Sequence, residues 1–204
     1  MSEPGAARDV AGLGGWTAAL LLAQAGVSVI AVAVAWGHGP GFIDLSPSYA
    51  VVALFQTLVF VAAGVAVLRW TYLTSANAHA FGAQALRYGP WLATLSYFIP
   101  IANLAMPLQS LRDVWKASVE PRDWEIVKVP ALLGFWWFFW LAGNIAGIAA
   151  FRLADEDFVE ANRTAETLTT LSDALTVAAS VLLALIVRRL TALQQGRTAA
   201  LAMA

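Results

Sequence analysis

Four long apolar runs alternate with shorter polar stretches along the chain. They cover about residues 16–36, 49–70, 131–151 and 168–187. Each run is close to the roughly 20 residues with which an α-helix crosses the hydrocarbon core of a bilayer. The pattern therefore predicts an all-α fold, an integral membrane four-helix bundle that forms one membrane domain over residues 1–204.

A further apolar stretch, residues 91–110, is interrupted by Pro100 and Pro107, with Asn103 between them. Each proline removes a backbone N–H donor and clashes with the preceding helical turn. In lipid, such a break is stable only where protein or water satisfies the freed backbone groups. We therefore expect a re-entrant or interfacial segment between the second and third spans, and not a complete extra span.

An amphipathic pattern follows over about residues 108–118. Arg112 and Lys116 lie one helical turn apart in it. The apolar face beside them consists of Leu108, Leu111 and Trp115. Basic groups beside an apolar face are typical of a helix that lies at the membrane interface and contacts anionic lipid.

Few polar side chains interrupt the spans. Gln56, Asn144 and Asp173 fall in the outer half of the membrane, and an acidic residue there is by default a hypothesis for proton or cation handling. Alternatively, Asp173 is structural, because it falls in the first two turns of its predicted helix, where the helix dipole favours a carboxylate. It could also pair with Arg152. The sequence favours the structural interpretation and leaves the polar path open.

The third span contains a small-xxx-small motif, Gly143 to Gly147. Small residues let helix backbones approach closely in lipid. We expect close packing at this motif, with Asn144 buried beside it. Contact within the chain is favoured over contact between copies, and both remain open.

The same span carries the densest aromatic run, Phe135-Trp-Trp-Phe-Phe-Trp140. Trp136, Trp137 and Trp140 are candidates for contact with a lipid tail or a pigment. The simpler interpretation is that these side chains face lipid or fill the packing near the cytoplasmic interface, and the sequence favours it.

Composition narrows the functional classes. The chain is 60% hydrophobic and only 12% charged, against about 25% charged in soluble domains. It lacks cysteine and has two histidines, His38 and His79, which are predicted on opposite sides of the membrane. Thiolate metal sites and bis-histidine haem are thereby excluded, and we expect no metal, no cofactor and no enzymatic activity. The net charge of −1 argues against a nucleic-acid partner.

Basic residues indicate the orientation of the chain in the membrane and the end of one span. Residues 69–128 carry six Lys and Arg, so the positive-inside rule places this region and both termini on the cytoplasmic side. Arg188 and Arg189 are expected to end the fourth span, and the tail from Gln194 is expected to fray.

Several short motifs lie in the middle of the chain. They are Arg69-Trp70, Asn77-Ala78, Phe98-Ile-Pro-Ile-Ala-Asn-Leu104, Pro107, Leu111-Arg112, Trp115-Lys-Ala-Ser118, Trp136-Trp137, Trp140-Leu141 and Asn144. Together they resemble a bacterial membrane family catalogued only as domain of unknown function 4328, over about residues 50–190. The resemblance implies a multi-pass protein of the bacterial inner membrane, and it supplies no catalytic residues.

These observations favour a non-enzymatic packing, scaffold or accessory subunit of a larger membrane assembly. Its expected partners are membrane lipids, and other membrane subunits or further copies of itself. The alternative is a small transporter or channel-like module that uses the broken segment and the polar intramembrane residues, because discontinuous helices commonly build substrate sites.

Overall fold

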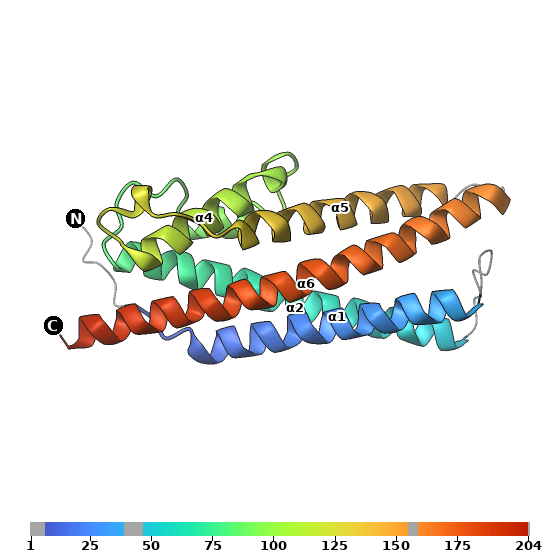
Figure 1. Cartoon of the computed structure of the whole chain (residues 1–204), viewed down its shortest axis with the longest axis horizontal. Helices are drawn as coiled ribbons and strands as arrows, with labels where there is room; N and C mark the ends of the chain where they lie inside the picture. Colours follow the sequence, from blue (N-terminus) through green and yellow to red (C-terminus); the bar gives the residue numbers. More distant parts are fainter. Residues whose placement is uncertain (1–6, 39–46, 155–158, 204) are drawn as a thin grey trace. The chain divides into compact units, whose positions relative to one another are not determined.

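The computed structural model describes residues 7–38, 47–154 and 159–203. Within these ranges the chain is helical and contains no strand (Figure 1). Its four long helices are α1 (Ala11–His38), α2 (Pro47–Ala80), α5 (Ala131–Leu153) and α6 (Val159–Ala202). Each contains a segment long and apolar enough to cross a membrane. The prediction of an all-α membrane bundle of four helices is confirmed.

The chain packs as two compact units. Unit 1 consists of Met1–Ala19, Gly64–Gly134 and Ala184–Ala204. Unit 2 consists of Leu20–Ala63 and Phe135–Leu183. Each of the four long helices contributes one part to unit 1 and another part to unit 2.

The short helices all belong to unit 1. They are α3 (Pro90–Leu95), the 3-10 helix η1 (Ala102–Leu104), α4 (Met106–Val119) and the 3-10 helix η2 (Trp124–Ile126). Pro90 and Pro107 occupy the first turns of α3 and α4, where a missing N–H removes no helical hydrogen bond. Ile101, between α3 and η1, has a positive φ of 68°, which is uncommon for a residue with a side chain.

The core of unit 1 includes a buried polar network. The Gln194 side chain is fully buried, and its Nε2 donates to the Thr74 carbonyl oxygen at 2.9 Å and to Ser118 Oγ at 3.0 Å. The Asn77 amide donates to Gln194 Oε1 at 3.0 Å and to the Arg8 carbonyl oxygen at 2.8 Å. The network joins α2, α4, α6 and the segment before α1.

This network corrects one expectation for the last helix. The tail does not fray at Gln194, since burial and hydrogen bonding hold that residue within α6, which continues to Ala202. Arg188 and Arg189, which follow the predicted fourth span, are exposed on the surface of α6, and the helix continues past them.

Unit 2 contains the glycine motif of α5, which packs against α6. A Cβ atom on Gly143 would lie 3.4 Å from Leu175 Cβ, and one on Gly147 would lie 3.1 Å from Ser172 Oγ. The Ser172 hydroxyl also donates to the Gly143 carbonyl oxygen at 2.9 Å. Within the chain, the two helices thus approach closely where α5 lacks side chains.

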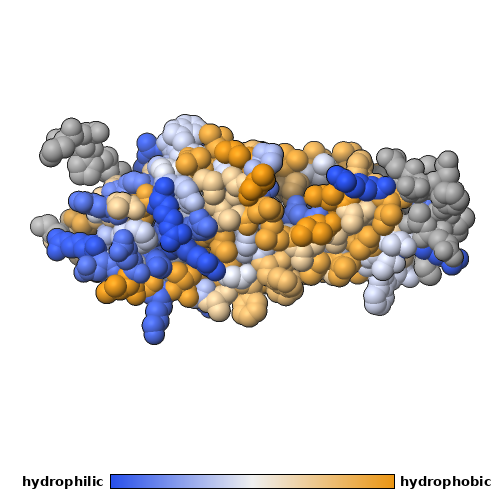
Figure 2. Space-filling model, turned by 90° about the horizontal axis from the view of Figure 1, so that it is seen from above, coloured by the Kyte–Doolittle hydropathy of each residue, from blue (hydrophilic) through white to orange (hydrophobic). Residues whose placement is uncertain are grey.

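The helix surfaces in unit 2 expose many large apolar side chains. Examples are Leu54, Phe55 and Leu58 on α2 and Phe138 on α5, all more than half exposed. Figure 2 shows hydrophobic side chains over much of the visible surface. Such extensive apolar exposure is typical of a surface that faces lipid and not water.

Candidate functional site

A polar cluster lies between three helices of unit 2. Gln56 Nε2, on α2, donates to Asp173 Oδ1 on α6 at 2.7 Å and to Ser28 Oγ on α1 at 3.4 Å. Gln24 lies one turn from Ser28 on α1 and is buried, and its Oε1 has no hydrogen-bond partner within the described part of the chain. The structure thus brings together two of the three residues of the predicted polar path, Gln56 and Asp173.

The structure changes the explanation for Asp173. Because α6 begins at Val159, Asp173 lies 14 residues into the helix, beyond the first turn in which the helix dipole acts. Among the described residues, no ion pair joins Asp173 to Arg152; the carboxylate is held by Gln56 instead. If Asp173 has a structural role, the Gln56 amide stabilises its carboxylate, and not the helix dipole or Arg152.

Asn144, the third residue of the predicted path, is exposed on α5 and is not buried as expected. Its Nδ2 donates to the Trp140 carbonyl oxygen one turn earlier, at 2.7 Å. The glycine motif and Asn144 occupy different faces, since Gly143 and Gly147 turn toward α6. An amide within a membrane span is therefore on the outside of this chain.

The aromatic residues of α5 divide between the two parts of the simpler interpretation, since some are exposed and others fill the packing. Trp136 is 1% exposed and Trp137 is 5% exposed, whereas Phe135 and Phe138 are more than half exposed. Trp137 stacks on Trp140, with ring centroids 4.6 Å apart and planes at 19°. Phe135 and Phe138 therefore lie on the outer surface, whereas Trp136 and Trp137 are buried in the packing.

The broken segment presents an apolar surface in unit 1. Its most exposed large side chains are Trp91, Phe98 and Ile101, at 68%, 68% and 84% exposure. Pro107 is buried, and Asn103 Oδ1 is buried without a hydrogen-bond partner in the described residues. The Asn103 backbone N–H, by contrast, donates to the Ile99 carbonyl oxygen at 2.9 Å, so the turn satisfies that donor itself.

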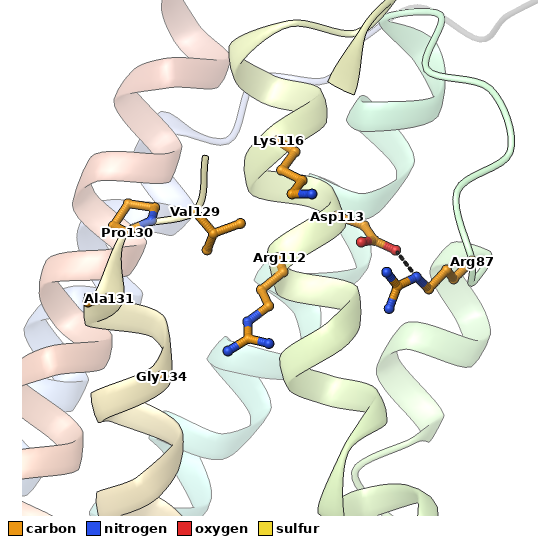
Figure 3. A pocket seen from close by; sticks show the side chains of 8 residues that line it. All are labelled: Arg87, Arg112, Asp113, Lys116, Val129, Pro130, Ala131 and Gly134. Carbon is orange, nitrogen blue, oxygen red and sulfur yellow. Dashed lines mark ion pairs between the residues drawn. The ribbon is translucent and has the colours of Figure 1, made fainter. Parts of the chain in front are cut away.

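A basic cavity of about 310 Å³ opens between α4, the loop before α3 and the first turn of α5. We name it the basic cavity. Its lining residues are Arg87, Arg112, Asp113, Lys116, Val129, Pro130, Ala131 and Gly134. Figure 3 shows the Arg112 side chain directed toward the first turn of α5, and the Asp113 carboxylate directed toward Arg87.

The charges in the basic cavity are unequal. Arg87 Nε lies 3.5 Å from Asp113 Oδ2, the one acidic side chain in the lining. Burial raises the pKa of the Asp113 carboxyl, and the positive charge of Arg87 opposes that rise. Lys116 Nζ donates to the Glu125 carbonyl oxygen at 3.1 Å and lies 5.9 Å from the Trp124 ring centroid. Arg112 makes no ion pair with another described residue.

Sequence reasoning found only part of this cavity. Arg112 and Lys116 were predicted from the amphipathic pattern. Arg87 was not, because it lies in the loop before α3, and Asp113 was not, because it lies on the buried side of α4. The sequence signal that could have pointed to Asp113 was an acidic residue between two basic ones in an amphipathic helix.

A second, larger cavity of about 420 Å³ lies beside η2. It carries charges of both signs, from Arg122, Asp123 and Glu125.

No curated protein and no solved structure matches the chain. A family model does match, over residues 46–192, and that range includes all of α2, α3, α4 and α5 and most of α6. The matched range also includes Gln56, Asp173, the glycine motif and every residue that lines the basic cavity. The chain therefore belongs to the family described as Domain of unknown function (DUF4328).

Proposed function

We propose that this protein is a non-enzymatic accessory subunit of a larger membrane assembly, in which it packs against another membrane protein. In this proposal it lies in a bacterial inner membrane with both termini in the cytoplasm, as the distribution of its basic residues favours. The exposed side chain of Asn144 carries the proposal.

Asn144 lies 13 residues after the start of α5, about 20 Å along the helix axis. This distance puts the side chain well inside a hydrocarbon core of about 30 Å. One amide hydrogen is satisfied by Trp140, while the rest of the amide is exposed beside Ile145 and Ile148. A polar amide that faces lipid tails costs free energy unless it finds a partner, so a polar group of a neighbouring transmembrane helix would satisfy it.

Site-specific photocrosslinking in native membranes tests this function. Benzoylphenylalanine would replace Asn144 or Ile148, which lie one turn apart on the same face and are both exposed. Phe138, also exposed but on a different face of α5, is the matched control position. We expect one distinct membrane protein of fixed mass to be crosslinked from 144 and 148 and not from 138. Adducts with lipid alone, or with a second copy of this chain alone, would overturn the proposal.

A second candidate function is that of a small transporter, and the cluster of Gln56, Asp173 and Ser28 favours it. The Gln56 amide donates to the Asp173 carboxylate and to Ser28, so polar side chains of three helices meet beside one carboxylate within the apolar helices, which is an arrangement that ion pathways use. The test is ion and solute flux in liposomes. Transport that is lost in Asp173→Asn, while the variant still folds, would replace the accessory function by this one.

A further inference from the structure

We propose that the basic cavity binds the phosphate group of an anionic phosphate ester, a chemistry shared by anionic phospholipid headgroups and free phosphate compounds. The proposal is independent of the accessory function. It rests on the charge of the cavity, on the free guanidinium of Arg112, and on the helix end that closes the cavity.

The cavity carries an excess of positive charge. Arg87, Arg112 and Lys116 supply three cations, and Asp113 supplies one carboxylate. Since Asp113 is buried and lies next to Arg87, it offsets the charge of that arginine first. Arg112 and Lys116 thus contribute a net positive charge to the remaining space, which favours an anion over a neutral or cationic ligand.

Arg112 has the side chain best suited to hold the ligand. Its guanidinium makes no hydrogen bond or ion pair with any other described residue and is directed toward α5 (Figure 3). A guanidinium presents two parallel N–H groups, which match two oxygens of a phosphate. Lys116, although it donates to a carbonyl oxygen, is a cation with three donors and can contribute a further bond.

The first turn of α5 closes the cavity on the other side. Helix N-termini offer unpaired backbone N–H groups and a partial positive charge, and both favour phosphate. No acidic residue occupies the first turn of α5 to neutralise this charge. Gly134 leaves space in front of the guanidinium: a Cβ atom there would lie 3.8 Å from Arg112 Nη2, and a larger side chain would extend into the cavity.

The size and place of the cavity fit a small phosphate ester. About 310 Å³ is at the lower end of the range for small-molecule sites. The cavity lies where α5 begins its apolar span, at Ala131, which is the depth of lipid headgroups when this helix crosses a bilayer. A phospholipid could therefore place its phosphate here while its acyl chains remain in the bilayer.

Binding to the full-length protein in a non-ionic detergent tests the proposal. The probes are dihexanoyl phosphatidylglycerol below its micelle concentration and inorganic phosphate, each measured by the rise in unfolding temperature and by native mass spectrometry. We expect Arg112→Ala to weaken binding about tenfold or more, because it removes a charge-assisted bidentate contact. Arg122→Ala is the matched control, since Arg122 is exposed and lines the other cavity.

A second variant keeps the charge and removes the space. Gly134→Leu should abolish binding while Arg112 stays in place, and its unfolding temperature without ligand shows whether the fold is kept. Binding of the phospholipid alone, sensitive to both variants, identifies a lipid headgroup as the ligand; binding of inorganic phosphate alone identifies a soluble phosphate compound. If neither probe binds, or if binding is the same in Arg112→Ala as in the unaltered protein, the proposal is overturned.

Discussion

The Asn77 side chain on α2 donates a hydrogen bond to the side-chain carbonyl of Gln194 on α6, at 3.0 Å and fully out of contact with solvent. The two residues are 117 positions apart in the chain. Gln194 also binds Thr74 and Ser118, so a single side chain links three helices of unit 1. A buried network of this kind is stable only while each member keeps its partners.

Gln194→Leu should therefore destabilise the protein. Leucine has a similar size, but it removes the acceptor of one Asn77 amide N–H and the side-chain donor to the Thr74 carbonyl oxygen, at a cost of about 1–3 kcal/mol. Thermal unfolding in detergent would report this as a lower midpoint. Gln195→Leu is the matched control, because Gln195 is exposed on the same helix. Equal midpoints for the two variants would show that the network contributes nothing to stability.

Two adjacent glycines on α1 should respond oppositely to the same substitution. A Cβ atom on Gly14 would lie 2.8 Å from Thr191 Cγ2 and would collide with Thr191 Oγ1, the acceptor of the Trp70 indole N–H. A Cβ atom on Gly15 would meet nothing within 4 Å.

We expect Gly14→Ala to lower the free energy of unfolding by about 1–3 kcal/mol, because the packing must shift to admit the methyl group. Gly15→Ala should raise it by up to about 1 kcal/mol, since alanine is the better helix former. Chemical or thermal denaturation of both variants checks the pair. The packing argument fails if Gly14→Ala is as stable as Gly15→Ala.

The apolar runs were enough to predict the four long helices, because the length of a run and its lack of charge are local properties of the sequence. The break at Pro100 and Pro107 was visible for the same reason: proline acts on its own turn. In the structure this region forms α3, η1 and α4. The pairing of Gln56 with Asp173 was not visible, since it depends on which faces of two distant helices meet.

The end of α6 also depends on contacts with distant residues, which the local sequence does not reveal. Gln194 lies in a mainly polar stretch of sequence that is typical of a frayed terminus. Only its distant hydrogen-bond partners make it a core residue. The aromatic run in α5 likewise gave no indication of which rings face inward. Trp136 and Trp137 are buried and Phe138 is exposed, an order that depends on the position of the neighbouring helices and not on hydrophobicity.

The glycine motif of α5 offers a test of packing inside the chain. Gly147→Leu should lower the unfolding midpoint of the monomer, because Ser172 Oγ lies 3.1 Å from where its Cβ would be, and overpacking costs about 1–3 kcal/mol. Gly26→Leu is the control, since Gly26 is exposed and its Cβ would meet nothing within 4 Å. The measurement is thermal unfolding of the monomer, isolated by size-exclusion chromatography in detergent. A monomer of normal stability that no longer associates would instead assign the motif to contacts between chains.

Asp113 should give the protein a measurable dependence of stability on pH. Burial raises the pKa of its carboxyl above the ordinary value of 3.8, and Arg87 opposes the rise only in part. The folded state therefore binds the proton more tightly than the unfolded state does. The resulting stabilisation is complete below the unfolded pKa and is lost as the pH rises through the higher folded pKa.

The difference between the unaltered protein and Asp113→Asn isolates this contribution, because asparagine has a similar shape and does not titrate. From about pH 4 upward, we expect the unfolding midpoint of the unaltered protein to fall relative to that of the variant, until the folded pKa is passed. Each unit by which the pKa is raised corresponds to at most about 1.4 kcal/mol. Asp123→Asn, at an exposed position, is the matched control for the substitution itself. The opposite result is that the unfolding midpoint of the unaltered protein rises relative to that of Asp113→Asn as the pH rises. It would mean that attraction to Arg87 outweighs burial at this carboxylate.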